Sequence, residues 1–157
     1  MKSEMISTAN LCDENENIVI FDHAYKHYGL VKSYAGIIQT ISIDEDNAKI
    51  IETLKQNGEG QVLIVKVKGK KCAVIGDRLS GIAISNGWKC IIVDGYIRDI
   101  EEINNMNIGI WAKGTYPKRS TKKAKGTTGE TLTINNTKII PKQQIYLDQD
   151  GIVIQEK

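Results

Sequence analysis

Apolar residues gather in short runs along most of the chain, and the spacing within these runs predicts a strand-rich fold. Many runs are dense in Ile and Val, and turn-forming residues separate them. The run at 90–93 is apolar throughout, which is typical of a strand buried on both faces. Strands are predicted over residues 18–21, 36–43, 61–67, 72–75, 90–93, 108–111, 131–134, 138–140, 144–147 and 152–154.

Helices are predicted for three segments, at 7–15, 47–56 and 77–86. In the second segment apolar residues recur at helical spacing, acidic and amide residues at 44–47 supply capping groups, and an Asn-Gly pair ends the helix. The middle of the chain then alternates strand, helix, strand, helix, strand, whereas the C-terminal third is mostly strands. This order predicts a mixed α/β fold with a β-rich flank, in a single domain that spans residues 1–157.

The composition narrows the class of protein. The 157 residues are 41% hydrophobic and 25% charged, which fits one globular domain, and the net charge of +2 argues against general nucleic-acid binding. No apolar run approaches the roughly 20 residues of a membrane span, and no apolar signal-peptide core is found near the N-terminus. Three irregularly spaced cysteines (Cys12, Cys72 and Cys90) favour reduced thiols, and we expect a cytoplasmic protein.

Two polar motifs follow neighbouring predicted strands and suggest a ligand site. Gly76 and Asp77 begin the sequence GDRL where a predicted strand becomes a helix, and Arg98-Asp99 follows the next buried strand. Free N–H groups at a helix N-terminus attract carboxylates, and ligands bind at the carboxyl edge of parallel sheets. The alternative is that Asp77 is an ordinary N-cap and that Arg98 and Asp99 form a surface pair.

The stretch that contains these motifs, GDRL…NGW…IIVDGYIRD, resembles the RraA-like family. Weaker matches at 8–13, 28–40, 57–63 and 146–153 follow in the family's order over nearly the whole chain. The family includes the class II 4-hydroxy-4-methyl-2-oxoglutarate/4-carboxy-4-hydroxy-2-oxoadipate aldolases. It also includes RraA, the regulator of ribonuclease E activity.

One spacing within the match favours the enzyme branch of the family. The aldolases are marked by an Asp, twenty residues and then Arg-Asp, and Asp77 with Arg98 and Asp99 matches this in full. The ribonuclease E regulators typically lack the second Asp. The resemblance therefore implies a divalent-metal-dependent class II aldolase or decarboxylase. Such an enzyme cleaves a 4-hydroxy-2-oxo acid, such as 4-hydroxy-4-methyl-2-oxoglutarate, or oxaloacetate, and gives pyruvate through a metal-stabilised enolate.

The resemblance also implies roles for individual residues. Asp99 is expected to be the metal ligand, with Mg²⁺ as the expected ion and Mn²⁺ as an alternative, and Asp77 and Arg98 are expected to be catalytic. The residues expected to bind the substrate are Gly76, Asp77, Arg78, Leu79 and Arg98. The family has a layered β/β/α fold of the swivelling-domain type. Its members typically form homotrimers or dimers of trimers, with active sites at subunit interfaces.

Two other functions stand beside the aldolase. The chain could be a non-catalytic RraA-type regulator that binds and inhibits ribonuclease E, or an unknown carboxylic-acid lyase that uses the same site. A demethylmenaquinone methyltransferase activity, once attributed to the family, finds no support because the sequence has no glycine-rich motif typical of methyl-donor binding.

Two segments concentrate basic residues. At 66–71 the family usually has an acidic, glycine-rich stretch, and here the residues are KVKGKK, with four lysines. A solvated hairpin or surface strand is one interpretation. The other is a site that is tuned for a polyanionic substrate or that has lost the family reaction. Residues 113–125 hold six basic residues and no acid, which predicts a mobile solvated loop, with RNA or acidic-protein binding as the alternative.

Overall fold

The computed structural model describes residues 7–21, 24–121 and 125–156. Within these residues, no helix is long and apolar enough to cross a membrane. The elements follow in the order α1 (Thr8–Glu14), β1 (Ile18–Ile20), β2 (Lys26–Tyr28), β3 (Tyr34–Asp44), α2 (Ala48–Leu54), β4 (Gln61–Lys68), β5 (Ala73–Ile75), α3 (Asp77–Ser85), β6 (Cys90–Ile97), α4 (Ile100–Ile103), β7 (Gly109–Thr115), β8 (Gly126–Thr128), β9 (Leu132–Ile134), β10 (Thr137–Ile139), β11 (Gln144–Leu147) and β12 (Ile152–Gln155).

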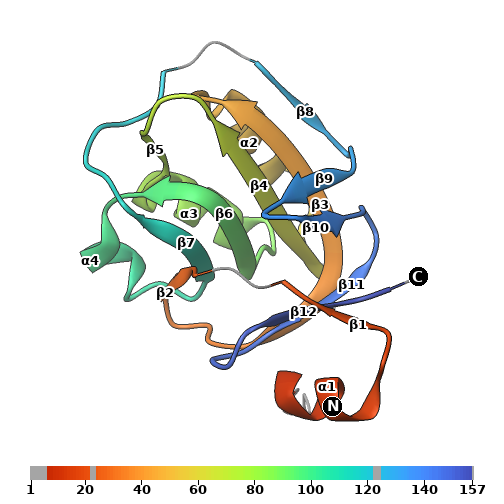
Figure 1. Cartoon of the computed structure of the whole chain (residues 1–157). Helices are drawn as coiled ribbons and strands as arrows, with labels where there is room; N and C mark the ends of the chain where they lie inside the picture. Colours follow the sequence, from red (N-terminus) through yellow and green to blue (C-terminus); the bar gives the residue numbers. More distant parts are fainter. Residues whose placement is uncertain (1–6, 22–23, 122–124, 157) are drawn as a thin grey trace.

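The larger sheet has a parallel centre with antiparallel strands on both sides (Figure 1). Among the described residues its order is β1-β12-β11-β3-β4-β6-β7-β2, with β5 paired to β6 and β8 paired to β3. β3, β4, β6 and β7 run parallel, and Ile64 of β4 lies opposite Thr40 on one side and Ile92 on the other. β9 and β10 form a separate hairpin. Because parallel strands end at the same edge of a sheet, the polar residues that follow β5 and β6 meet there.

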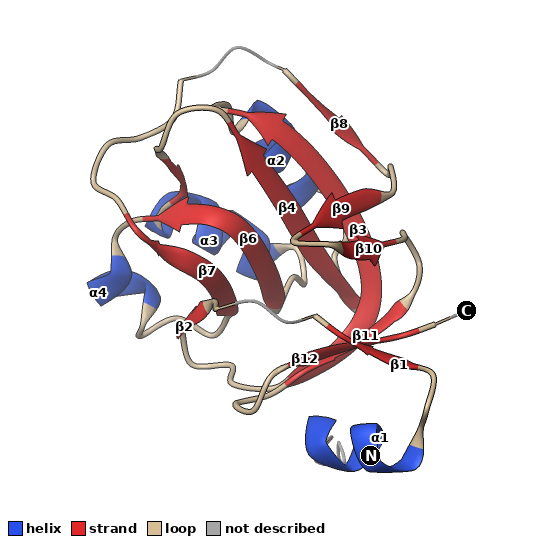
Figure 2. Ribbon diagram, viewed as in Figure 1, coloured by secondary structure: helices blue, strands red, loops and turns tan. Residues whose placement is uncertain are grey.

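Alternate side chains of the central strands pack into two cores, one on each face of the sheet. On β4, Leu63 and Val65 belong to the core that α2 and α3 cover, whereas Val62 and Ile64 belong to the core that the β9–β10 hairpin covers. Figure 2 shows α2 and α3 on one side of the sheet and the β9–β10 hairpin on the other. This is the layered β/β/α arrangement that the family resemblance implies. It also explains why these strands are continuous apolar runs in the sequence.

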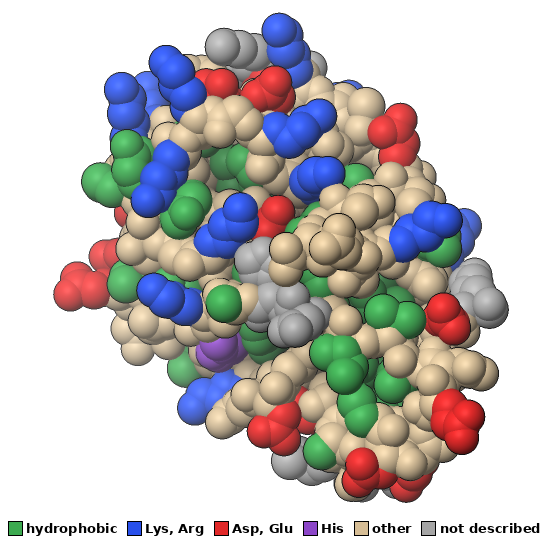
Figure 3. Space-filling model, in the orientation of Figure 1, with side chains coloured by type: hydrophobic (Ala, Val, Ile, Leu, Met, Phe, Trp, Pro, Cys, Tyr) green, Lys and Arg blue, Asp and Glu red, His purple; other side chains and the backbone are tan. Residues whose placement is uncertain are grey.

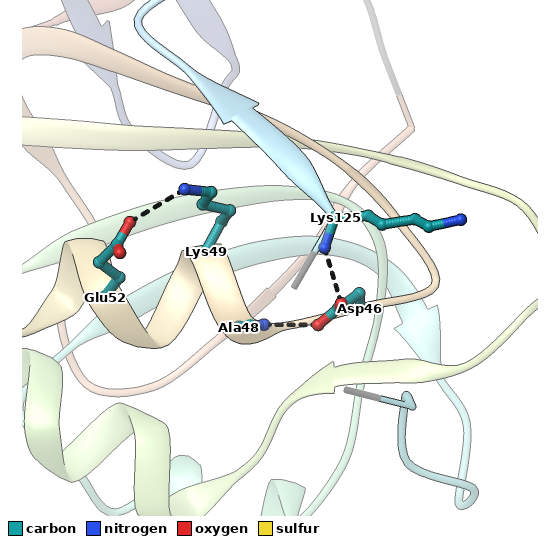
Figure 4. Close-up of polar contacts among 5 residues, drawn as sticks. All are labelled: Asp46, Ala48, Lys49, Glu52 and Lys125. Atoms are coloured by element: carbon teal, nitrogen blue, oxygen red, sulfur yellow. Dashed lines mark hydrogen bonds and ion pairs between the residues drawn. The ribbon is translucent and has the colours of Figure 1, made fainter. Parts of the chain in front are cut away.

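The buried carboxylate of Asp46 fixes the start of α2 and the return of the chain toward β8 (Figure 4). Its Oδ1 accepts a hydrogen bond from the N–H of Ala48 at 2.7 Å, and its Oδ2 accepts one from the N–H of Lys125 at 2.9 Å. The first of these bonds satisfies a helix N–H that has no partner within the helix. Within α2, Lys49 and Glu52 form an ion pair at 3.3 Å. The acidic segment before the helix therefore supplies the cap, as its composition predicts.

Three short elements, β2, β8 and α4, are absent from the predicted set. β2 contains Lys26, His27 and Tyr28, which show no apolar alternation, and it joins the sheet by pairing with β7. β8 is a Gly-Thr-Thr segment on the edge of β3, and α4 is a single turn. β6 also continues past the predicted end at residue 93, because its last residues pair with β5 and β7. For the strands, pairing with a distant segment decides the structure.

The segment predicted as a mobile loop over 113–125 begins as a strand and is then held by backbone pairing in its described part, and its mobility stays a prediction. Its first residues belong to β7. The N–H of Ala73 then donates to the carbonyl of Lys118 at 2.7 Å, and the N–H of Ser120 donates to the carbonyl of Ala73 at 3.0 Å. These bonds place the segment along β5, and no local pattern of apolar residues predicts this position. The basic residues at 122–124 lie outside the described residues.

Candidate active site

Two neighbouring parallel strands, β5 and β6, bring the predicted site residues to one edge of the sheet. β5 ends at Ile75, and Gly76 is the N-cap of α3, which starts at Asp77. β6 ends at Ile97, and the N–H of Arg98 donates to the carbonyl of Ile75 at 3.0 Å. The two motifs therefore lie side by side, as their positions after consecutive strands predict.

The carboxylate of Asp99 lies against the N-terminus of α3. Its Oδ2 accepts a hydrogen bond from the N–H of Asp77 at 3.0 Å, where the partial positive charge of the helix end stabilises an anion. Asp99 adopts the left-handed conformation, with φ 65° and ψ 42°, which is uncommon for a residue other than glycine. A Cβ atom on Gly76 would stand 2.5 Å from this Oδ2. Glycine therefore leaves the room that the carboxylate occupies.

These contacts contradict the simpler interpretation of the motifs as a cap and a surface pair. Asp77 is the first residue of the helix and not its cap, and Asp99 binds the backbone of α3. The Nη1 of Arg98 donates to the carbonyl of Pro117 at 3.1 Å. One nitrogen thus anchors the guanidinium, which has further N–H donors for a ligand.

A pocket of 220 Å³ lies between these groups. The predicted residues that line it are Gly76, Asp77, Arg78, Leu79, Arg98 and Asp99. Three polar residues that the sequence did not single out also line it, namely Asn47, Arg119 and Ser120. The first lies in a segment predicted only as a helix start, and the other two lie in the basic segment after β7. Its basic character was the one signal that could have drawn attention to them.

Positive charge surrounds this pocket. Arg78, Arg98 and Arg119 line it, and among the described residues no carboxylate lies within ion-pairing distance of their guanidinium groups. Figure 3 shows Lys and Arg side chains gathered in the upper half of the view, around the segments that follow β4 and β7. Arginine side chains without an acidic partner are suited to bind carboxylates, and a positive cleft attracts anionic substrates.

The lysine-rich segment at 66–71 does not line the pocket. Its residues from 68 onward are exposed, which agrees with the surface-strand interpretation. The ammonium group of Lys71 lies 4.4 Å from the centre of the Tyr96 ring and 5.2 Å from that of Tyr116. Tyr116 in turn lines a neighbouring hollow of 330 Å³ that shares Arg98 with the pocket. Lys71 thus adds positive charge near that neighbouring hollow.

The donor atoms at the pocket suit a hard divalent cation. The carboxylates of Asp77 and Asp99 line it. Mg²⁺ is commonly held by one or two carboxylates and several waters, which an oxygen-rich set of this kind matches. In the described part of the chain no group of three or more His, Cys, Asp or Glu side chains could hold a metal. A bound ion would therefore depend on few protein ligands and on water.

A larger hollow, of 440 Å³, shares no residue with this pocket, and several of its polar groups already bind protein. The hydroxyl of Tyr25 donates to Oδ1 of Asp94 at 3.0 Å, and burial raises the pKa of Tyr25. The Nε2 of His27 lies 2.7 Å from the carbonyl oxygen of Val31. The smaller pocket, in contrast, contains polar atoms without partners. It is therefore the better candidate for a ligand site.

Comparison with known proteins agrees with the family resemblance. The family model RraA-like, described as Aldolase/RraA, matches residues 8–154. The chain belongs to the RraA-like family. A relative from Bacillus cereus, named "Putative 4-hydroxy-4-methyl-2-oxoglutarate aldolase", is 39% identical over 155 residues, which cover 98% of each chain.

Solved structures place the fold of this RraA-like protein in the same family. A crystal structure from Geobacillus kaustophilus, named as an S-adenosylmethionine: 2-dimethylmenaquinone methyltransferase, has a TM-score of 0.92 at 35% identity and covers 97% of this chain and 96% of that one. The RNA-processing inhibitor RraA from Thermus thermophilus has a TM-score of 0.91 at 30% identity, with 97% and 93% covered. The layered fold expected from the sequence is therefore confirmed.

Proposed function

We propose that this RraA-like protein is a divalent-metal-dependent class II aldolase that cleaves a 4-hydroxy-2-oxo acid, such as 4-hydroxy-4-methyl-2-oxoglutarate, to give pyruvate. Decarboxylation of oxaloacetate, which yields the same pyruvate enolate, is proposed as a second activity of the same site. The observation that carries the proposal is the position of the Asp99 carboxylate, 3.0 Å from the N–H of Asp77 in a pocket that Arg98 also lines. The names of the relatives support the same chemistry.

The 2-oxo acid end of the substrate would bind at the start of α3. In an α-helix the first N–H groups have no partner within the helix, and those of Arg78 and Leu79 are suited to hold a carboxylate. Arg98, fixed by its bond to the carbonyl of Pro117, would donate to the keto oxygen. A Mg²⁺ or Mn²⁺ ion held by Asp99 would supply positive charge that stabilises the negative charge developing on that oxygen.

Cleavage breaks the bond between carbons 3 and 4 of the substrate. The hydroxyl on carbon 4 loses its proton and becomes a carbonyl, while the bonding electrons remain on carbon 3 as the pyruvate enolate. The exposed carboxylate of Asp77 is suited to accept the hydroxyl proton through a water molecule. Arg98 is suited to stabilise the enolate oxygen until carbon 3 takes up a proton.

The proposal includes assembly as a homotrimer or a dimer of trimers, with the pocket at a subunit interface. Light scattering coupled to size-exclusion chromatography tests this part, and a species of three or six chain masses is expected. A monomer that retains full turnover would contradict a shared active site.

The experiment that tests the reaction measures pyruvate release from 4-hydroxy-4-methyl-2-oxoglutarate and from oxaloacetate, with Mg²⁺, with EDTA and on Asp99→Ala. We expect turnover that requires the metal and falls by about a thousandfold in Asp99→Ala, because the ligand for the cation and the anion at the helix end are both removed. Asp13→Ala, an exposed carboxylate on α1, is the matched control and should behave as wild type. Turnover that survives EDTA and Asp99→Ala would refute the proposal.

A second candidate function is binding to ribonuclease E, because the Thermus RNA-processing inhibitor has nearly the same fold. Under this function the protein would inhibit RNA cleavage by ribonuclease E, and Asp99→Ala would inhibit as well as wild type. Inhibition that survives Asp99→Ala, together with no pyruvate release by the folded wild-type protein, would favour the regulator over the aldolase.

A further inference from the structure

Three polar residues extend the pocket along β5, away from Gly76. The Nδ2 of Asn47 donates to the carbonyl of Val74 at 3.3 Å, and the N–H of Ser120 donates to the carbonyl of Ala73 at 3.0 Å. Arg119, next to Ser120, forms a parallel bridge with Ala73. A strand rises about 3.3 Å per residue, and so these groups lie roughly 7–10 Å from Gly76 along the strand. A five-carbon dicarboxylate is long enough to contact both ends of such a pocket.

Two buried atoms at this far end have no hydrogen-bond partner among the described residues. They are the Oγ of Ser120 and the Oδ1 of Asn47, and the Ser120 side chain belongs to a residue that is only 6% exposed. Buried polar atoms are rarely left unpaired in native proteins, so both atoms are available to bind a ligand or a water molecule. Since Nδ2 of Asn47 already donates to a carbonyl, the atom left over is the amide oxygen, which can only accept.

Arg119 supplies charge at the same end of the pocket. Its side chain is exposed and lines the pocket together with Ser120, and no carboxylate within the described residues is close enough to form an ion pair with it. A planar guanidinium binds a carboxylate through two parallel hydrogen bonds. The neighbouring hydroxyl of Ser120 can donate a third hydrogen bond to the same carboxylate.

We propose that Arg119 and the hydroxyl of Ser120 bind the second carboxylate of the substrate, and that they make this protein specific for 4-hydroxy-2-oxo dicarboxylates over monocarboxylates. The inference rests on the proposed function, in which the 2-oxo acid end lies at Gly76 and Asp99. The carboxylate on carbon 4 then faces Arg119. The acceptor oxygen of Asn47 faces the water molecule that carries the hydroxyl proton to Asp77. After cleavage, the leaving 2-oxo acid keeps its carboxylate on Arg119.

Two substrates that differ by one carboxylate test this subsite. They are 4-hydroxy-4-methyl-2-oxoglutarate and 4-hydroxy-2-oxopentanoate, in which a hydrogen replaces the carboxylate on carbon 4. We expect Arg119→Gln to lower kcat/KM for the dicarboxylate by about 10- to 100-fold, the effect of losing a hydrogen bond to a charged group, and to leave the monocarboxylate within about threefold. Arg119→Lys should be intermediate, because it keeps the charge but loses the paired donors. Lys138→Gln removes an exposed charge on β10, which lines neither this pocket nor the hollows beside it, and should change neither value.

A third measurement separates the subsite from the proposed reaction. Exchange of the pyruvate methyl protons with deuterium, followed by NMR with Mg²⁺, needs only the 2-oxo acid end of the pocket. Arg119→Gln should keep this exchange. An equal loss on both substrates and in exchange, or no loss on the dicarboxylate, would overturn the subsite while the aldolase stands. Wild-type protein that neither exchanges pyruvate protons nor cleaves either substrate would overturn the proposed function, and the subsite with it.

Discussion

Substitution of Gly76 by alanine tests whether the position of the Asp99 carboxylate matters for activity. The backbone of Gly76, with φ −128° and ψ −163°, is extended and suits alanine without strain. The effect of the new methyl group is therefore local. It would stand 2.5 Å from Oδ2 of Asp99, whereas an ordinary contact of this kind is at least 3.4 Å, and so the carboxylate must move by about 0.9 Å.

That displacement should cost far more activity than stability. Moving Oδ2 weakens its bond to the N–H of Asp77, which lowers the free energy of unfolding by about 1–2 kcal/mol, partly offset by the reduced flexibility of the unfolded chain. In activity, a misplacement of about 1 Å at a reacting centre can cost about a hundredfold, or roughly 2.7 kcal/mol in the barrier. We therefore expect Gly76→Ala to remain folded and to lose about two orders of magnitude in kcat/KM for pyruvate release.

Gly81→Ala is the matched control, because it is the same substitution further along the chain, within α3. The nearest atom to its new Cβ is the Cε of Met106 at 4.0 Å, which leaves enough room. The replacement should raise the free energy of unfolding by up to about 1 kcal/mol, because alanine favours a helix interior, and should leave pyruvate release unchanged. Thermal unfolding and steady-state kinetics of wild type, Gly76→Ala and Gly81→Ala measure these two effects. Wild-type kinetics in a folded Gly76→Ala would refute the role given to the Asp99 position.

Two further predictions concern stability. Gly58→Ala would place a Cβ 2.0 Å from the ring of Trp88, a residue that is 1% exposed. We expect urea unfolding to show that the free energy of unfolding falls by about 1–3 kcal/mol, and an unchanged unfolding midpoint would contradict this packing. Burial alone would raise the pKa of Asp148, but hydrogen bonds from Thr8 and the following turn hold it below its usual value. The stability advantage of wild type over Asp148→Asn should therefore be full near neutral pH and vanish as acid protonates the carboxylate, and parallel pH profiles of thermal unfolding for the two proteins would contradict this.

The sequence could predict those parts of the fold in which local pattern and burial agree. The apolar runs within β4 and β6 are buried on both faces, so that almost every position in them is apolar. α2 follows from helical spacing together with the capping carboxylate of Asp46. The meeting of Asp77 and Asp99 follows as well, because consecutive parallel strands must end at one edge.

Elements that depend on distant pairing have no such local pattern. β2, with Lys26 and His27, forms because β7 offers an edge, and His27 packs against the side of Trp111 with ring centres 4.7 Å apart. β8 similarly depends on the edge of β3. Apolar residues that recur every two or every 3.6 positions indicate which face of an element is buried. They do not indicate that a short polar segment completes the edge of a sheet.

The two ends of the pocket also differ in whether local pattern or distant pairing builds them. The end at Gly76 and Asp99 is built by β5 and β6, whose apolar positions lie in the core, and so its geometry is tied to the stability of the fold. The end at Asn47, Arg119 and Ser120 is built by segments that reach β5 only through hydrogen bonds to backbone carbonyls and through backbone pairing. The exposed side chain of Arg119 can change without disturbing the core. Chemistry fixed at the first end and recognition that varies at the second would let one fold process different 2-oxo acids, and substitutions at Arg119 should therefore alter substrate preference while pyruvate exchange continues.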